Sequence, residues 1–213
     1  LPFQPFEYVD DNGEYAGFDM DLSREIAAGM GLDWELQNVG FDGLQSGTVL
    51  AAGQCDLIAA AVTITPERED KLAFSDPYYD SLQSLLVPEG SSVKSLEDLA
   101  GKKVGVQQGT TGETYARENA GDAEIVSYQS DAELFPALQA GNIDAVLQDL
   151  PVNLDHTDGG AFTISATYET DEVYGFAMKK TGSEDLVAAV NAELAELRSN
   201  GKYQEIYDKY FTE

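Results

Sequence analysis

Alternating strand and helix patterns constrain the fold of this chain most strongly. After residue 100, short apolar runs predict strands over 103–107, 124–128 and 144–148, and helical periodicity predicts helices over 112–119 and 132–140. Nearer the start, the same reasoning predicts a helix over 19–30, a strand over 34–37, a helix over 43–52 and a buried parallel strand over 57–62. This alternation is typical of doubly wound α/β sheets with helices on both faces.

The length of 213 residues, 43% of them hydrophobic, suffices for two small lobes with their own cores. Two further helices are predicted over 184–198 and 202–211, separated by Asn200-Gly201, and we expect both to pack on the first lobe. The chain has no repeat of solenoid period, which also favours one bilobed unit.

The charge balance argues against two classes of partner. The chain has 12 Lys and Arg against 39 Asp and Glu, a formal charge of -27. So acidic a surface repels nucleic-acid phosphates and anionic lipid headgroups, so we expect no nucleic-acid binding and no direct membrane insertion.

Cysteine and histidine chemistry is nearly absent from the sequence. Cys55 is the single cysteine and His156 the single histidine, so no internal disulfide and no cysteine-based metal site can form. We expect Cys55 to begin a buried strand and His156 to lie in a loop, and we expect no metal and no cofactor.

The run from Thr63 to Tyr79 predicts an anion site. Pro66 suits the first position of a helix and Thr65 its N-cap, so free backbone N–H groups and the Arg68 guanidinium could converge on one carboxylate. The alternative is a surface helix on which Arg68 pairs with Glu67, Glu69 or Asp70.

Several other motifs accompany this run along the chain. They are Pro5-Phe-Glu-Tyr, Gly17-Phe-Asp-Met-Asp-Leu, Phe41-Asp-Gly-Leu, Gly53-Gln-Cys-Asp-Leu, the segment 95–111, Ala140-Gly-Asn-Ile-Asp-Ala-Val-Leu-Gln-Asp and the segment 200–211. In order and spacing the series resembles the extracytoplasmic polar-amino-acid-binding proteins of ABC importers, solute-binding protein family 3.

The resemblance implies two doubly wound α/β lobes joined by two crossing hinge strands, the type II periplasmic-binding-protein fold. Lobe 1 would comprise 1–81 and 174–213 and lobe 2 would comprise 82–173, with crossings near 78–82 and 170–174. Members of the family normally begin with a short apolar strand that this chain lacks, so we expect either that lobe 1 is without its leading strand or that another segment fills that place in its sheet.

The resemblance also assigns roles in ligand binding. Arg68, the Thr63 hydroxyl and, from the second lobe, Thr111 would bind the α-carboxylate of an amino acid, because a guanidinium binds a carboxylate in bidentate fashion. Asp149 and the Ala61 carbonyl would accept from the α-ammonium. Without the resemblance, Thr111 reads as an ordinary helix cap and Asp149 as the N-cap of a helix beginning at Pro151.

Four further positions match those that contact the rest of the ligand in the family. Phe3 and Phe41 would pack on its aliphatic stem, and Gln107 and Gln148 would contact its distal end; each could otherwise be a core or strand-end residue. Arg68 is the one evident cation, which argues against an acidic ligand, and no extra carboxylate can be assigned for a basic one. An uncharged polar ligand such as glutamine is therefore expected.

The expected function is a non-enzymatic receptor, a monomer that captures a free amino acid and docks to an importer permease. It would work outside the cytoplasm, in a periplasm or at a cell surface through a lipid anchor. One alternative is a cyclohexadienyl dehydratase on the same fold, acting on prephenate or arogenate with Asp149 as general acid. The other is a sensory ligand-binding domain.

Overall fold

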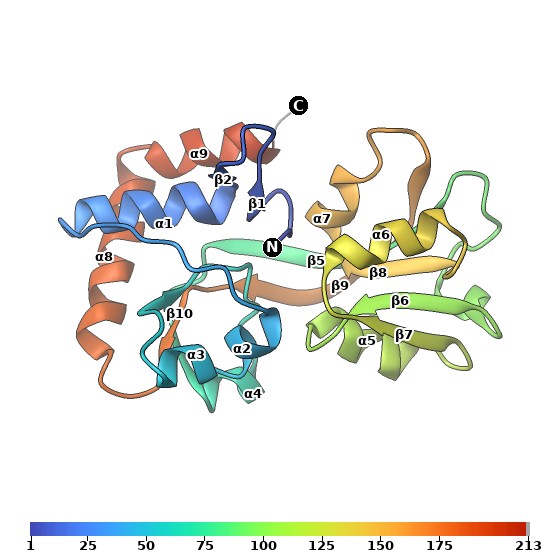
Figure 1. The fold of residues 1–213 in the computed structure, drawn as a ribbon, viewed down its shortest axis with the longest axis horizontal. Coiled ribbons are helices and arrows are strands. Elements are labelled where there is room, and N and C mark those ends of the chain that lie inside the picture. Colours follow the sequence, from blue (N-terminus) through green and yellow to red (C-terminus); the bar gives the residue numbers. More distant parts are fainter. Residues whose placement is uncertain (212–213) are drawn as a thin grey trace. The chain divides into compact units, whose positions relative to one another are not determined.

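The computed structural model describes residues 1–211, which divide into two compact units. The central unit contains residues 1–2 and 81–172, and the terminal unit contains residues 3–80 and 173–211. The chain passes between the units within β5 (Tyr79–Pro88) and within β9 (Phe162–Tyr174) (Figure 1).

The central unit is built on a five-stranded sheet of order β7-β6-β8-β5-β9. Its inner strands are β6 (Lys103–Gln107), β7 (Glu124–Tyr128) and β8 (Ala145–Asp149), with β6 parallel to both β7 and β8. Strand β5 runs antiparallel to β8, pairing Gln83 with Asp149. The three parallel strands match the ranges predicted from the sequence to within one residue.

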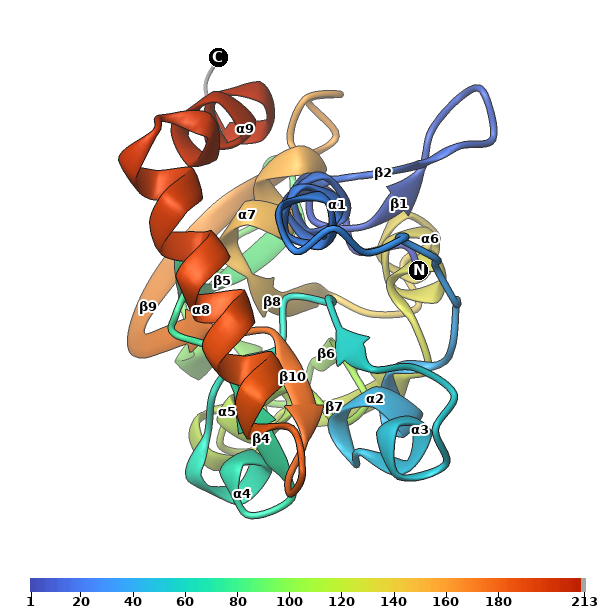
Figure 2. The ribbon, with the colours of Figure 1, turned by 90° about the vertical axis from the view of Figure 1, so that its left-hand side faces the viewer.

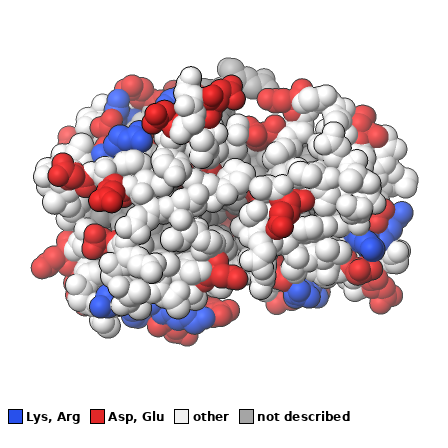
Figure 3. Space-filling model, in the orientation of Figure 1, with Lys and Arg blue, Asp and Glu red and all other residues white. Residues whose placement is uncertain are grey.

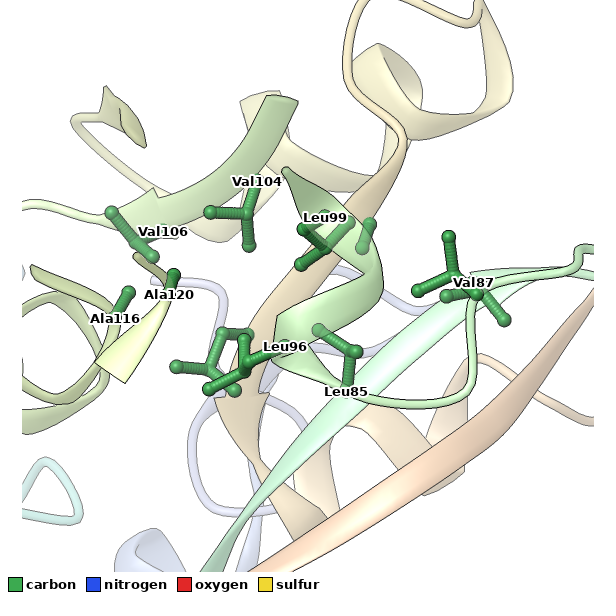
Figure 4. Close-up of a cluster of buried hydrophobic side chains, with 11 residues drawn as sticks. Leu85, Val87, Leu96, Leu99, Val104, Val106, Ala116 and Ala120 are labelled. Carbon is green, nitrogen blue, oxygen red and sulfur yellow. The ribbon is translucent and has the colours of Figure 1, made fainter. Parts of the chain in front are cut away.

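Helices cover both faces of this sheet. Figure 1 shows α5 (Thr111–Asn119) and α6 (Asp131–Gln139) on opposite sides of it. The 3-10 helix η1 (Leu96–Leu99) and α7 (Leu150–Asp155) complete the unit. Alternate residues of the strands face the α5 side, where Val104 and Val106 pack with Leu85, Leu96 and Leu99 in a buried apolar cluster (Figure 4).

Gly105 faces the opposite side of β6, toward α6. A Cβ built on Gly105 would lie 2.4 Å from Ile143 Cδ1 and 2.9 Å from Leu134 Cδ2, so the close packing of helix and strand requires glycine here. We expect Gly105→Ala to lower the free energy of unfolding by about 1–3 kcal/mol through overpacking. Urea unfolding checks this, with Gly159→Ala as the matched control because a Cβ there meets nothing within 4 Å; equal effects would contradict the packing argument.

The terminal unit combines short strands with longer helices. Its three-stranded sheet has the order β3-β10-β4, formed by β3 (Leu57–Ile58), β10 (Ala177–Lys179) and β4 (Leu72–Phe74), and a hairpin joins β1 (Tyr8–Val9) to β2 (Tyr15–Ala16). Its long helices are α1 (Phe18–Gly29), α8 (Glu184–Ser199) and α9 (Lys202–Phe211). Both C-terminal helices contact α1, which agrees with their predicted packing on the lobe that contains the start of the chain, and Figure 2 shows α8 leading into α9.

Three expectations for the terminal unit were wrong. Residues 34–37 form no strand, because no described strand pairs with them; the free edge of β3, on the side away from β10, has no neighbouring strand among the described residues. The Trp34 indole instead donates to Ser23 Oγ on α1 at 3.0 Å. The helix predicted over 43–52 is two short helices, α2 (Phe41–Gln45) and α3 (Thr48–Ala51). They are separated at Gly47, whose φ of 73° is left-handed.

The third error concerns the buried strand predicted over 57–62. Only Leu57 and Ile58 form β3, and they pair antiparallel with β10 rather than in parallel. The strand ends early because the chain turns away from the sheet, reaching a φ of 45° at Ala61. The apolar run therefore marks burial correctly but not strand length or direction.

Stacked aromatic rings hold the crossing segments in the terminal unit. Tyr78 stacks on Phe176 with ring centroids 4.4 Å apart, and Tyr79 stacks on Tyr174 at 5.5 Å. Tyr78, Tyr174 and Phe176 are fully buried. These pairs fix both crossing segments where they leave the terminal unit.

Cys55 is a free, half-buried thiol two residues before β3, and burial raises its pKa. His156 follows α7, and its ring stacks on Phe135; burial lowers the pKa of His156 to about 4.

Acidic side chains are spread over the face of the molecule in Figure 3, with basic groups in a few small clusters. None of the helices within the described residues is both long and apolar enough to cross a bilayer. In the same residues no group of three or more His, Cys, Asp and Glu side chains is placed to hold a metal ion.

Candidate ligand-binding site

In the terminal unit, a short helix positions Arg68. Helix α4 (Pro66–Glu69) has Pro66 in its first turn and Thr65 as N-cap, and Thr65 Oγ1 accepts from the Arg68 N–H at 3.2 Å. This confirms the helix start predicted from the sequence.

The Arg68 side chain is buried, with 6% of its surface exposed. Its Nη1 donates to the Thr63 carbonyl at 2.9 Å, and its Cζ lies 5.5 Å from the centre of the Phe41 ring. Glu67 pairs with Lys71 at 3.1 Å on the exposed side of the helix. The solvent-facing helix considered as an alternative therefore does not describe Arg68, because burying a guanidinium is costly unless it serves a structural or binding role.

The segment before α4 is fixed by a buried carboxylate. Asp19 Oδ2 accepts from the Ala61 N–H and from the Tyr78 hydroxyl, both at 2.7 Å. These bonds hold Ala61 in its left-handed conformation, φ 45°. Burial raises the pKa of Asp19 to about 7, although both hydrogen bonds act to lower it. Beyond Ala61, Thr63 is buried and bridged to Tyr174.

In the central unit, Asp149 ends β8 and is 4% exposed. It occupies the N-cap position of α7, yet its side chain makes no capping hydrogen bond. Asp149 Oδ1 accepts instead from Gln83 Nε2 at 2.5 Å, and the same Gln83 nitrogen donates to Glu172 Oε2 at 2.9 Å. The capping alternative thus accounts for the position of Asp149 but not for the direction of its side chain.

Gln148 joins Asp149 to a residue that sequence reasoning missed. Its Nε2 donates to Asp131 Oδ1 at 2.7 Å, and its Oε1 accepts from the Asp149 N–H at 3.2 Å. Asp131 is the first residue of α6 and is 3% exposed. Burial and, second, the charge of Asp149 raise the pKa of Asp131 to about 8, while the Gln148 hydrogen bond and the Leu1 ammonium lower it.

The loop between β6 and α5 lies at the same edge of the sheet. Thr110, rather than Thr111, caps α5, since its Oγ1 accepts from the Glu113 N–H at 3.1 Å, and Glu113 Oε2 accepts from the Gly109 N–H at 2.7 Å. Thr111 is the first helical residue and is half-buried; Gln107 ends β6 and is buried.

The predicted site residues therefore form two groups. Phe41, Ala61, Thr63 and Arg68 belong to the terminal unit, and Gln107, Thr111, Gln148 and Asp149 to the central unit. Phe3, also of the terminal unit, is half-buried, bridges to Glu7 and packs near Phe6 (ring centroids 6.1 Å); no described contact joins it to Arg68.

Asp19, Gln83, Asp131 and Glu172 were not predicted to take part. Asp19 lies in a motif that supported the resemblance, Gly17-Phe-Asp, but nothing local indicates its contact with Ala61, which is 42 residues away. Asp131 could have been found, because it follows a predicted strand at the carboxyl edge where open α/β sheets bind ligands.

Two α/β units connected by two crossing strands, with buried polar groups at the ends of their strands, define a bilobed protein of the periplasmic-binding class. The family of bacterial extracellular solute-binding proteins, family 3, matches residues 1–213. The chain belongs to this family.

Its relatives bind different amino acids. The glutamine-binding protein GlnH of a Bacillus subtilis ABC transporter is 38% identical over 95% of this chain and 75% of its own length. An ancestral arginine-binding protein, solved with arginine and with glutamine, is 37% identical, with a TM-score of 0.92 and coverage of 98–99% of this chain and 94% of the solved chain. An ancestral amino acid-binding protein described as a precursor of cyclohexadienyl dehydratase is 36% identical, with a TM-score of 0.91 over 99% of this chain and 92% of its own.

Proposed function

We propose that this protein is a receptor that binds a free L-amino acid and delivers it to an ABC importer. The observation that carries the proposal is the buried guanidinium of Arg68, held beside Thr63. Relatives that bind glutamine or arginine support the ligand class.

The charges fit the two ends of a zwitterion. Arg68 would bind the α-carboxylate with the Thr63 hydroxyl and, from the central unit, Thr111 at the N-terminus of α5. Asp149 and the Ala61 carbonyl would accept from the α-ammonium. Phe3 and Phe41 would contact the aliphatic stem, with Gln107 and Gln148 toward the distal end.

Since these groups are divided between the units, one small ligand would be coordinated in full only when the units close on it about 78–82 and 170–174. Contacts made only in the closed form would give the ligand a higher affinity for that form, which shifts the population toward it. A permease could then distinguish the loaded receptor from the empty one. We place the protein outside the cytoplasm and expect it to act as a monomer.

A thermal-shift screen of the proteinogenic amino acids tests the proposal. A ligand that binds only the folded protein at 100 times its Kd stabilises it by about 2.7 kcal/mol, which raises the melting temperature by several degrees. Small-angle scattering with the ligand so identified should show a smaller radius of gyration. No shift with any amino acid would contradict the proposed function.

A second candidate function is that of a cyclohexadienyl dehydratase, because a similar solved structure is described as a precursor of that enzyme. Incubation of the protein with prephenate and with arogenate tests it, and we expect no elimination of water from either. A binding experiment with a purified permease complex distinguishes transport from a sensory role. Binding of the loaded receptor to the permease would support transport.

A further inference from the structure

The central unit buries a carboxylate oxygen that has no hydrogen-bond partner. Asp131 is 3% exposed; its Oδ1 accepts from Gln148, and its Oδ2 is fully enclosed without a partner among the described residues. A buried carboxyl oxygen left unpaired, whether it is an acceptor or carries the proton, costs free energy in the unliganded protein. Such an atom at the edge of a binding site is suited to accept from a ligand.

The position of Asp131 places it at that edge. It begins α6 directly after the loop that follows β7, and its partner Gln148 precedes Asp149 at the carboxyl end of β8. Because β6, β7 and β8 are parallel, their carboxyl ends share one edge of the sheet, where ligands bind in open α/β folds.

Buried carboxylates outnumber buried cationic side chains among the described residues of the central unit. Asp131, Asp149 and Glu172 are buried, whereas none of the unit's lysines and arginines, all of which the structure describes, is buried. The α-ammonium of an amino acid would compensate Asp149. The Leu1 ammonium, which belongs to the same unit, already acts to lower the pKa of Asp131, yet burial and the charge of Asp149 keep this pKa at about 8. A cation on the ligand would favour the ionised form of Asp131 further.

We propose, on the basis of the proposed function, that Asp131 is a specificity-determining residue whose Oδ2 binds the cationic end of a basic amino acid. A guanidinium or side-chain ammonium would satisfy the unpartnered oxygen and its charge together. Gln148, bonded to both Asp131 and Asp149, would keep the two carboxylates in fixed relation. The sequence alone favours an uncharged ligand, because no carboxylate can be assigned from it to a basic side chain. Asp131 would be that carboxylate.

The protonation state of Asp131 gives the proposal a second observable. With a pKa of about 8, raised by burial and by Asp149 on β8 and lowered by Gln148 and the Leu1 ammonium, Asp131 is mostly protonated at pH 7 without ligand. A bound cation lowers this pKa, so binding of a basic ligand at pH 7 releases up to about one proton. A neutral ligand of the same shape does not.

Calorimetric titration with arginine and with citrulline tests the proposal, because citrulline carries a neutral urea in place of the guanidinium. We expect the parent protein to prefer arginine roughly tenfold or more. Asp131→Asn retains an oxygen that can accept from Gln148 and should remove most of this preference by weakening arginine alone. Asp158→Asn, an exposed change of equal charge, should leave it intact.

If Asp131→Asn does not fold, proton release on arginine binding can still be measured on the parent protein. Heats of arginine binding measured in buffers of different ionisation enthalpy should report the released proton. Equal affinities for arginine and citrulline, or an Asp131→Asn variant that weakens both equally, would overturn the inference and leave the proposed function in place. Failure of every amino acid to bind would overturn the proposed function itself.

Discussion

Replacing Arg68 by alanine should abolish amino-acid binding at concentrations that saturate the parent protein. Arg68 is the buried cation of the proposed site, and removing one partner of a desolvated charge pair costs about 2–5 kcal/mol, which is roughly 30-fold to several-thousand-fold in Kd. Calorimetry with the ligand found in the thermal screen measures the loss.

Two further variants separate binding from folding. Arg68→Lys keeps the charge but loses the planar, forked donor geometry, so it should recover little affinity. Arg117→Ala, an exposed arginine paired with Glu113 at 2.7 Å, should bind as the parent does. An Arg68→Ala protein that melts cooperatively and binds within a few-fold of the parent would remove Arg68 from the site.

The strands of the central unit could be predicted closely from the sequence, because each gives a clear signal in its own few residues. Residues 104–107 and 145–149 are continuous buried runs, and each is followed by a helix with its own start signal, such as Thr110, whose Oγ1 accepts from the Glu113 N–H. A strand that is buried on both faces of a sheet is a continuous apolar run in the sequence, and this run can be recognised without knowing which strand pairs with it.

The terminal unit was predicted less well because its strands depend on tertiary pairing. Two residues suffice for β3 because β10 lies beside it, whereas the alternation at 34–37 finds no described strand to pair with. A helix broken at Gly47 likewise reflects a neighbour: a Cβ there would lie 2.8 Å from Leu72 Cδ2, in another part of the chain.

The site shows the same division between local and distant information. Thr65, Pro66 and Arg68 carry a signal within four residues, and the structure confirms the helix start. Asp131 has the sequence context of an ordinary acidic residue in a helix's first turn, which is normally solvated. Its place at the carboxyl edge of the sheet could have been predicted, but its burial beside Gln148 could not, because that depends on the packing of α6 on the sheet.

The buried carboxyls should make the unliganded protein more stable as the pH falls from 8 toward 5. Asp131 and Asp19 have pKa values near 8 and 7 in the folded protein, against about 3.8 when unfolded. Over this range the folded state binds more protons than the unfolded state, so the free energy of unfolding decreases as the pH rises. Each group contributes a slope of at most about 1.4 kcal/mol per pH unit.

His156 acts in the opposite direction at the acidic end. Its pKa is lowered to about 4 by burial, so the stability it contributes is lost as the pH falls from about 6.5 toward 4. From pH 6.5 to 8, His156 therefore does not oppose the effect of Asp131 and Asp19. There, the two slopes should add to well over 1 kcal/mol per pH unit until each group ionises.

Substitution of each aspartate separates the two contributions. Urea unfolding of Asp131→Asn at a series of pH values should lose a slope equivalent to as much as one proton, and the variant should exceed the parent in stability at pH 8, because no charge is buried. Asp19→Asn, whose side-chain oxygen can still accept from Ala61 and Tyr78, should lose its share nearer pH 7. Asp158→Asn carries the same change of net charge at an exposed position and should retain the parent slope. If both buried variants kept the slope of the parent, the carboxyls would be ionised in the folded protein, and the arginine-linked release of a proton from Asp131 would lose its source.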